Sequence, residues 1–420
     1  MENKKLTLET KKCIVLDLGR AYLEYSAIDA LCLLTFPDEP LYAVQAFKNA
    51  MSDDLEDPGI ENKGFSNHVG WLEPIKETIA PDADALNFIE KAAEEVRIKK
   101  GALLFVGSGP AYLAAKAGVD FFAQDNQLEV IFAGDLSAFS YKKMLEKLKG
   151  RKFSICAVED KEMPHGALTA LTNIKGAKNF YAFTNNSESV FCAMAKKSGA
   201  KVFIQKQEFT GPSIILSPGV LLPLAAIGVD IKAVIEGATP EEPLDMESYI
   251  PSGCGGAGAS RELLLPLPSL NIKNYSTSRR LLKDRGFSTE LLVYTNPILA
   301  GFINWFKYAS MSLMKEIKIH VDAIDLTNNA DMIENYAKTN KGLFETFIHV
   351  GNLGRHNIED LKTPADLNLS GDWLITDSMQ RQRKTGVPII RIEIPEVSPY
   401  FYGQMISMFS RTLAIMDIWK

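Results

Sequence analysis

A glycine-containing turn stands where an apolar run gives way to a helical pattern. The segment VGSGPAYLAAKAG at residues 106–118 contains Gly107, Ser108 and Gly109, and the helical pattern begins at Pro110. In a parallel α/β sheet, such a turn directs backbone N–H groups and a helix N-terminus towards the ligand crevice, a natural place for an anion. Alternatively, the two glycines only permit a tight strand-to-helix turn, and the motif alone does not decide between these readings.

A run of charged side chains follows another apolar segment. After FSICAV at residues 153–158 the chain reads EDKEMPH, which supplies the carboxylates Glu159 and Asp160, the ammonium group of Lys161 and the imidazole of His165. Carboxylates and imidazoles serve as general acids and bases, and a carboxylate pair also attracts cations. A charge run is equally typical of a solvated loop, so both interpretations stay open.

Other segments are weaker candidates. SMQRQRKTGV at residues 378–387 is cationic and precedes an apolar run, and we predict that it is an exposed loop. PSGCGGAGAS at residues 251–260 is glycine-rich but has no lysine and no GKS or GKT ending, so it does not indicate a nucleotide site. The five cysteines are scattered and contain no CxxC pair, which argues against a disulfide framework or a zinc site. We predict no metal and no cofactor.

Two series of alternating strands and helices position these candidates. The predicted strands of the first series are residues 103–107, 130–134, 153–158, 179–184 and 201–205, and those of the second are 290–295, 318–325, 345–351 and 389–395. Helical patterns lie between them, as at residues 141–149, 187–197 and 297–314. Apolar strands that alternate with helices favour parallel sheets covered on both faces. The predicted fold class is α/β, with two three-layer αβα domains whose doubly wound sheets are mainly parallel.

The predicted domain boundaries fall where apolar periodicity is lost. Residues 239–269 are rich in proline and glycine, and we expect them to connect a first domain at 71–238 to a second at 270–420. Residues 1–70 carry helical patterns and are predicted to form an appendage packed on the first domain.

The composition is that of an ordinary globular protein. Of the 420 residues, 46% are hydrophobic and 23% charged, and the formal net charge is -6 with basic residues spread along the chain. Because no basic patch stands out, neither nucleic acid nor anionic lipid is a predicted partner. No apolar run reaches the roughly 18 residues that a membrane span needs. The N-terminus MENKKLTLETKK lacks the apolar core of a signal peptide, so we predict a cytoplasmic protein.

Several ordered blocks resemble the glucose-6-phosphate isomerase family. VGSGPAYLAAKA at residues 106–117 aligns without a gap with the family's VGIGGSYLGAKA-like segment, and IILSPGVLLPLAAIGVDIKAVIEGA at residues 214–238 resembles its VLTPVGLLPIAVAGIDI segment. Further similar blocks lie at residues 129–155, 343–350 and 386–409. The resemblance runs from about Gly70 to the last residue. It implies two sugar-isomerase (SIS) domains, a homodimer and a site for a sugar-like ligand.

The resemblance also shows which residues stand at the family's phosphate cradle. The family interconverts an aldose phosphate and a ketose phosphate through an enediol, and it binds the phosphate with hydroxyl groups and backbone N–H groups. In this chain Pro110 and Ala111 stand where the family has Gly and Ser. Glu159, Asp160 and Lys161 begin the loop that in the family is rich in Ser and Thr. We expect a doubly negative sugar phosphate to be repelled there.

The positions that resemble the family's catalytic groups differ as well. The family's catalytic Arg falls on Pro212, and its ring-opening His falls on Asp331. Its carboxylate base falls on Ser312 or Met314, with Glu316 as the nearest substitute. The family's late active-site Lys lies beyond the last residue of this sequence. A site without most of its charged groups is not expected to stabilise the transition state of the isomerisation.

Three functions remain open at this point. The first is a diverged, non-catalytic homologue that acts as a binding or partner subunit. The second is a crevice refitted for an unphosphorylated or cationic ligand, with new chemistry from Glu159, Asp160, His165 and Asp331. The third is a working glucose-6-phosphate isomerase with relocated groups, in which Glu316 or Glu334 serves as the base.

Overall fold

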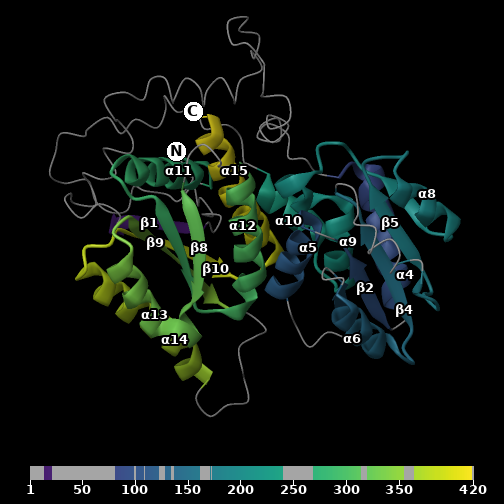
Figure 1. Ribbon diagram of the computed structural model, residues 1–420, viewed down its shortest axis with the longest axis horizontal. Helices are drawn as coiled ribbons and strands as arrows, with labels where there is room; N and C mark the ends of the chain where they lie inside the picture. Colours follow the sequence, from purple (N-terminus) through teal and green to yellow (C-terminus); the bar gives the residue numbers. More distant parts are fainter. Residues whose placement is uncertain are drawn as a thin grey trace, which may run out of the picture.

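Two five-stranded sheets organise the chain, and helices cover both faces of each (Figure 1). The computed structural model describes residues 14–20, 81–98, 101–107, 109–122, 128–133, 137–160, 171, 173–239, 268–313, 319–353 and 364–418. The predicted fold class, with two mainly parallel α/β sheets, is confirmed for these residues.

The first sheet is parallel throughout and has the strand order β3-β2-β4-β5-β6. Its strands are β2 Ala102–Val106, β3 Glu129–Ala133, β4 Phe153–Val158, β5 Phe180–Thr184 and β6 Lys201–Ile204. Each matches one of the five predicted apolar runs. Every residue of the central strands β2 and β4 is buried, which explains why these runs are apolar without alternation.

Successive residues of these strands face two separate cores. Cys156 and Val158 point into the larger core, whereas Ile155 and Ala157 point into the smaller one. The helices α4 Ala83–Ile98, α5 Pro110–Phe121, α9 Pro218–Ala226 and α10 Ile231–Ala238 contribute to the larger core, together with the 3-10 helix η2 Gly211–Leu216. The helices α6 Ala138–Leu148 and α8 Val190–Lys197 close the smaller core.

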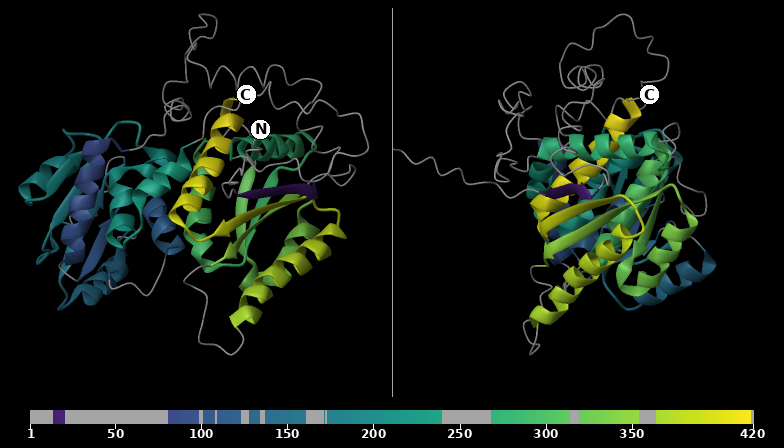
Figure 2. Two further views of the ribbon diagram at one scale, coloured as in Figure 1. Left: turned by 180° about the vertical axis from the view of Figure 1, so that it is seen from behind. Right: turned by 90° about the vertical axis from the view of Figure 1, so that its left-hand side faces the viewer.

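The second sheet has the strand order β1-β10-β9-β7-β8. Its parallel strands are β7 Thr289–Tyr294, β8 His320–Asp325, β9 Leu343–Asn352 and β10 Ile389–Glu396, again at the predicted positions. The helices α11 Pro268–Asp284, α12 Ala300–Leu313 and α15 Pro399–Ile418 cover one face, with the short η4 Pro297–Leu299 before α12. The helices α13 Leu326–Thr339 and α14 Pro364–Arg383 cover the other face (Figure 2).

Two segments differ from the prediction. Residues 15–20 form strand β1, which pairs antiparallel with β10 at the edge of the second sheet, so a helical appendage on the first domain does not describe these six residues. The pairing joins residues more than 360 positions apart, and local periodicity carries no information about such a partner. The cationic segment at 378–387 is not the predicted loop throughout, because its first six residues continue α14, where Ser378 and Gln382 are buried against the sheet.

Each sheet and the helices that cover it form one unit, and the two units meet at closely packed helix crossings. A Cβ atom added to Gly237 of α10 would lie 1.9 Å from the carbonyl oxygen of Tyr400, and one added to Gly403 of α15 would lie 2.0 Å from that of Val234. Only glycine permits this backbone approach at the two positions. Apolar side chains of both units then form one continuous core, so the units share a fixed interface.

Candidate functional site

The glycine turn has the predicted strand, turn and helix geometry. β2 ends at Val106 and α5 begins at Pro110, with Gly109 between them at a φ of 53°, a conformation that favours glycine. Ala111 is fully buried, and its methyl group lies in the larger core. A Cβ added to Gly107 would lie 3.0 Å from the ring of Phe105, so close packing also restricts that position. Ser108 lies outside the described residues.

Glu159 is the first residue after β4, and it is tied to the neighbouring strand. Its backbone N–H donates to the carbonyl of Phe183, which extends the β4–β5 ladder by one residue. One carboxylate oxygen, Oε2, accepts hydrogen bonds from the hydroxyl groups of Thr184 and Ser189, each at 2.6 Å. The side chain is only 5% exposed. Two hydroxyl groups at the carboxyl edge of the sheet are therefore bonded to the protein's own carboxylate.

The side chain of Asp160 points to the face of the first sheet opposite to that of Glu159, towards η2 and the larger core. Its Oδ1 accepts hydrogen bonds from the Thr210 hydroxyl at 2.8 Å and from the backbone N–H of Gly211 at 2.7 Å. These donors lie at the start of η2, whose next residue is the buried Pro212. The other oxygen of Asp160, Oδ2, is buried and has no hydrogen-bond partner among the residues that the structure describes. Asp160 thus fixes η2 with one oxygen and leaves the second unsatisfied.

The second unit reaches the same edge through α12. Burial, followed by the charge of Asp160, raises the pKa of Tyr308 in α12 above its ordinary value. The phenol is therefore within electrostatic reach of the carboxylate across the junction of the two units. Asp160 therefore lies near the junction of the two units, just after the carboxyl end of the parallel strand β4.

Comparisons with known proteins agree with this architecture. No protein-family model matches the chain. A glucose-6-phosphate isomerase of Listeria monocytogenes serotype 4b (strain F2365) is 27% identical over 386 residues, which cover 83% of this chain and 80% of that relative. A glucose-6-phosphate isomerase of Clostridium tetani (strain Massachusetts / E88) is 24% identical over an alignment of length 417, with a coverage of 90% of this chain and 87% of the relative. The chain resembles glucose-6-phosphate isomerases along most of its length. The predicted resemblance is confirmed.

Solved structures show the same fold. A hypothetical protein from Thermus thermophilus superposes with a TM-score of 0.68 at 15% identity, covering 97% of this chain and 94% of that one. A glucose-6-phosphate isomerase from Chlamydia trachomatis D/UW-3/Cx gives a TM-score of 0.64 at 14% identity, covering 97% and 84%. A tagatose-6-phosphate ketose/aldose isomerase from Escherichia coli gives 0.53 at 9% identity, covering 83% and 92%. The two sheets therefore have the fold of SIS-domain phosphosugar isomerases.

The remaining positions singled out by resemblance to glucose-6-phosphate isomerase are spread over the molecule. Asp331 is exposed on α13, the helix that lies with α14 on the outer face of the second sheet. Glu334, on the same helix, pairs with Arg381 at 3.2 Å and with Lys338 at 3.9 Å, so its carboxylate is already partnered. Lys161, His165, Met314 and Glu316 lie outside the described residues.

Sequence reasoning identifies Glu159 and Asp160 but not their partners. Thr184 ends β5, and Gln205 directly follows β6, so both stand at strand ends where a crevice residue is expected. Gln205 is 4% exposed, and within the described part of the chain neither its amide oxygen nor its amide nitrogen has a hydrogen-bond partner. Position after a strand was the available signal for these two, whereas no pattern marks Thr210 or Tyr308.

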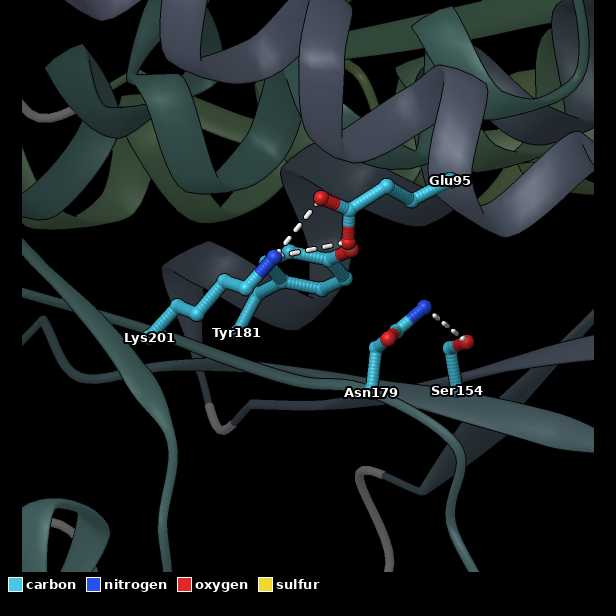
Figure 3. Close-up of polar contacts among 5 residues, drawn as sticks. All are labelled: Glu95, Ser154, Asn179, Tyr181 and Lys201. Carbon is cyan, nitrogen blue, oxygen red and sulfur yellow. Dashed lines mark hydrogen bonds and ion pairs between the residues drawn. The ribbon is translucent and has the colours of Figure 1, made fainter.

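A second polar cluster lies at the opposite, amino-terminal edge of the first sheet (Figure 3). The hydroxyl of Tyr181 donates to Oε2 of Glu95 at 2.6 Å, and Lys201 lies 2.7 Å from both oxygens of that carboxylate. All three side chains converge on one point from α4, β5 and β6. Because its charges and hydroxyl are mutually satisfied, this cluster joins α4 to the sheet and leaves the carboxyl edge as the better candidate site.

Within the described residues, no group of three or more His, Cys, Asp and Glu side chains is arranged to hold a metal ion. None of the helices in the described part of the chain is both long and apolar enough to cross a membrane.

Proposed function

We propose that this chain is a diverged relative of glucose-6-phosphate isomerase that does not interconvert glucose 6-phosphate and fructose 6-phosphate and acts instead as a non-catalytic binding protein. One observation carries the proposal. At the carboxyl edge of the first sheet, the protein's own carboxylates already accept the hydrogen bonds that a phosphate would need. These donors are the hydroxyl groups of Thr184, Ser189 and Thr210 and the backbone N–H of Gly211.

Electrostatics supports the same conclusion. Two unit charges about 6 Å apart repel by roughly 3 kcal/mol at an effective dielectric constant of about 20. Glu159 and Asp160 are both nearly buried, so bulk water screens them little. A phosphate dianion placed beside them meets two such repulsions, and no cation among the described contacts of Asp160 offsets them. Binding of a sugar phosphate in the manner of the family is therefore disfavoured by several kcal/mol.

The positions that resemble the catalytic residues point the same way. Pro212, which stands where the family has its Arg, is buried in η2 and cannot supply a cation. Asp331, which stands where the family has its His, is exposed on α13. Catalysis of proton transfer needs a base and a stabilised oxyanion at one place, and the described residues do not bring these groups together.

A coupled assay tests the proposal directly. Fructose 6-phosphate is added to the purified full-length protein, and formation of glucose 6-phosphate is followed through a coupled dehydrogenase, with the Listeria relative as positive control. We expect no turnover above the rate without protein. Turnover that copurifies with the folded protein and is lost on its heat denaturation would overturn the proposal, because a working isomerase would then have relocated its groups.

Further properties are proposed by the same analogy. We infer a cytoplasmic homodimer with a first domain at 71–238, a connection at 239–269 and a second domain at 270–420. The end of α10 at Ala238 and the start of α11 at Pro268 support these bounds. Light scattering of the purified protein tests the dimer, since a monomer mass near the 46.4 kDa of the chain would contradict it.

A further inference from the structure

A buried carboxyl group lies under helix α14, on the face of the second sheet that α13 and α14 cover (Figure 1). The side chain of Glu345 in β9 is fully buried, and neither of its oxygens has a hydrogen-bond partner among the described residues. Leu343 and Phe347, two positions before and after it, pack in the core between this sheet face and the two helices (the outer core). Because side chains alternate along a strand, Glu345 points into the outer core as well.

Apolar side chains flank Glu345 on both neighbouring strands. Its register partners are Leu291 of β7 and Ile389 of β10, and both belong to the outer core. The other positions of β7 on this face, residues 289 and 293, carry no ionisable group. An ionised carboxylate in such surroundings has lost its hydration without gaining a donor or a cation, which is costly. The packed arrangement therefore favours the neutral carboxyl group.

The charged side chains of the two nearest strands do not neutralise Glu345. On β10, Arg391 stands opposite Phe347, and its Nη2 lies 3.0 Å from Oε2 of Glu393. On β9, His349 is four residues further along the same face. Burial, and not a neighbouring charge, raises the pKa of Glu345 from 4.5 to about 8.

Helix α14 packs against β9 with a face that is only partly apolar. Ile375 and Met379 are buried in the outer core, whereas Ser378 and Gln382, on the same side of the helix, are buried polar side chains. In the described part of the chain, the amide nitrogen of Gln382 has no hydrogen-bond partner. Polar groups thus lie on both sides of the contact between α14 and the sheet, which weakens the attachment of the helix.

Partly exposed salt bridges join α14 to α13. Arg381 lies 2.6 Å from Oδ2 of Asp377 within α14 and 3.2 Å from Oε1 of Glu334 in α13, and such exposed pairs contribute little to stability. Tyr336 of α13, which packs against the outer core, donates its hydroxyl to Oδ2 of Asp322 at 2.8 Å. The outer core is also separate from the larger core that joins the two units. Release of α14 therefore leaves the junction of the units intact.

We propose that Glu345 and α14 form a pH-sensitive switch, in which ionisation of the buried carboxyl group releases α14 from the second sheet. In the released state water reaches the carboxyl group, and its pKa returns to the ordinary value of 4.5, whereas in the packed state the pKa is about 8. Each pH unit between these two values raises the equilibrium constant for release about tenfold, and the rise ends above about pH 8. This inference goes beyond the proposed function and does not depend on it.

Hydrogen exchange of the full-length protein, measured by mass spectrometry, tests the switch. Protection factors are compared at about pH 6 and about pH 9, after correction for the intrinsic effect of pH on exchange. We expect the protection of α14 to fall at least about tenfold between these values. Low urea concentrations distinguish release from global unfolding, because a local opening exposes little surface. Exchange of α14 should hardly respond to urea, whereas exchange of α12 and α15 in the larger core should respond strongly.

Variants assign the pH dependence to Glu345. Glu345→Gln removes the ionisation and keeps the shape of the side chain, so the protection of α14 should differ by less than about threefold between the two pH values. Glu345→Leu, which suits the apolar surroundings, is a second variant with the same expected result. Glu188→Gln, at an exposed position of the first unit, should show the pH dependence of the parent. Circular dichroism establishes that each variant is folded.

An infrared difference spectrum shows the protonation state directly. At about pH 6, the spectrum of the parent minus that of Glu345→Gln should contain the C=O stretch of a neutral carboxyl group. The switch is overturned if this band is missing, if the protection of α14 is the same at both pH values, or if it falls equally in folded Glu345→Gln. It is also overturned if α14 and α12 respond equally to urea, because α14 would then exchange only through global unfolding.

Discussion

Thr210 donates its hydroxyl to Oδ1 of Asp160 over 2.8 Å, and this bond ties the start of η2 to the end of β4. The same carboxylate oxygen accepts a hydrogen bond from the backbone N–H of Gly211, so both donors at the start of η2 are bonded to one negative side chain. These two donors at the carboxyl edge of the sheet therefore already have an anionic partner within the protein.

Replacing both carboxylates with amides should raise the affinity of this sheet edge for anions. In the Glu159→Gln/Asp160→Asn variant, two negative charges are removed, and each contributes a repulsion on the order of 1 to 3 kcal/mol to a nearby dianion. We expect the affinity for glucose 6-phosphate, measured by calorimetry, to rise at least tenfold. The Glu188→Gln/Glu94→Gln variant has the same net charge with both changes on exposed side chains, and it should show no rise. Equal gains in the two variants would mean that only overall charge matters.

Glu345 should make the stability of the protein depend on pH. This residue of β9 is fully buried, and its register neighbours are Leu291 and Ile389. Neither carboxylate oxygen has a hydrogen-bond partner in the described ranges of the chain. Burial raises the pKa of Glu345 from 4.5 to about 8. Between these values the unfolded chain has released the proton that the folded protein keeps. The free energy of unfolding therefore falls as pH rises from about 4.5 to 8 and levels off above 8.

The size of this effect is tested by replacing the titratable carboxyl group of Glu345 with an amide. At roughly 1.36 kcal/mol per pKa unit, the loss by about pH 8 is on the order of a few kcal/mol. The Glu345→Gln variant should be more stable than the parent above about pH 7 and should lose this part of the pH dependence in urea unfolding curves. Glu188→Gln, at an exposed site, serves as the control. An unchanged pH profile in Glu345→Gln would show that the buried carboxyl is ionised in the folded protein.

The crossing of α10 and α15 should not tolerate even one methyl group. Gly237→Ala places a Cβ within 1.9 Å of a backbone carbonyl, so the two helices must separate. We expect a loss of at least about 2 kcal/mol in the free energy of unfolding, as in other overpacked cores. Glu236→Ala, at the exposed neighbouring position, should change stability by less than about 0.5 kcal/mol. A stable Gly237→Ala variant would show that the two units can move apart at no cost.

The sequence predicts those elements whose partners lie nearby in the chain better than those whose partners lie far away. The strands β2, β4 and β5 were predictable because the burial of almost every residue makes each a nearly unbroken apolar run. β1 was not, because its partner β10 lies at the other end of the chain. At the site, the carboxylates Glu159 and Asp160 stand out as a charge run after a strand. Thr210 belongs to no such pattern, and only the folded chain brings its hydroxyl group to Asp160.

The buried ion pair of the second unit supplies a further prediction. Arg279 of α11 lies 2.7 Å from Oε2 of Glu290 in β7, and both side chains are fully inaccessible to solvent. The other oxygen of Glu290 accepts the hydroxyl groups of Tyr275 and Thr346, each at 2.7 Å. The guanidinium also lies 5.4 Å from the ring centre of Phe306. The two charges thus lie among polar and aromatic side chains, and each is neutralised by the other.

Removing one of the two charges should lower the free energy of unfolding far more than removing both. Arg279→Met leaves Glu290 ionised and buried without its cation, which is expected to lower the free energy of unfolding by about 3 to 5 kcal/mol. Arg279→Met/Glu290→Gln keeps the hydrogen bonds to Tyr275 and Thr346 without a net charge, and it should recover at least half of that loss. Arg151→Met, which breaks a solvent-exposed pair with Glu129, should cost less than about 1 kcal/mol. Urea unfolding measures all three, and a double variant no more stable than Arg279→Met would show that the guanidinium acts through packing on Phe306 rather than through its charge.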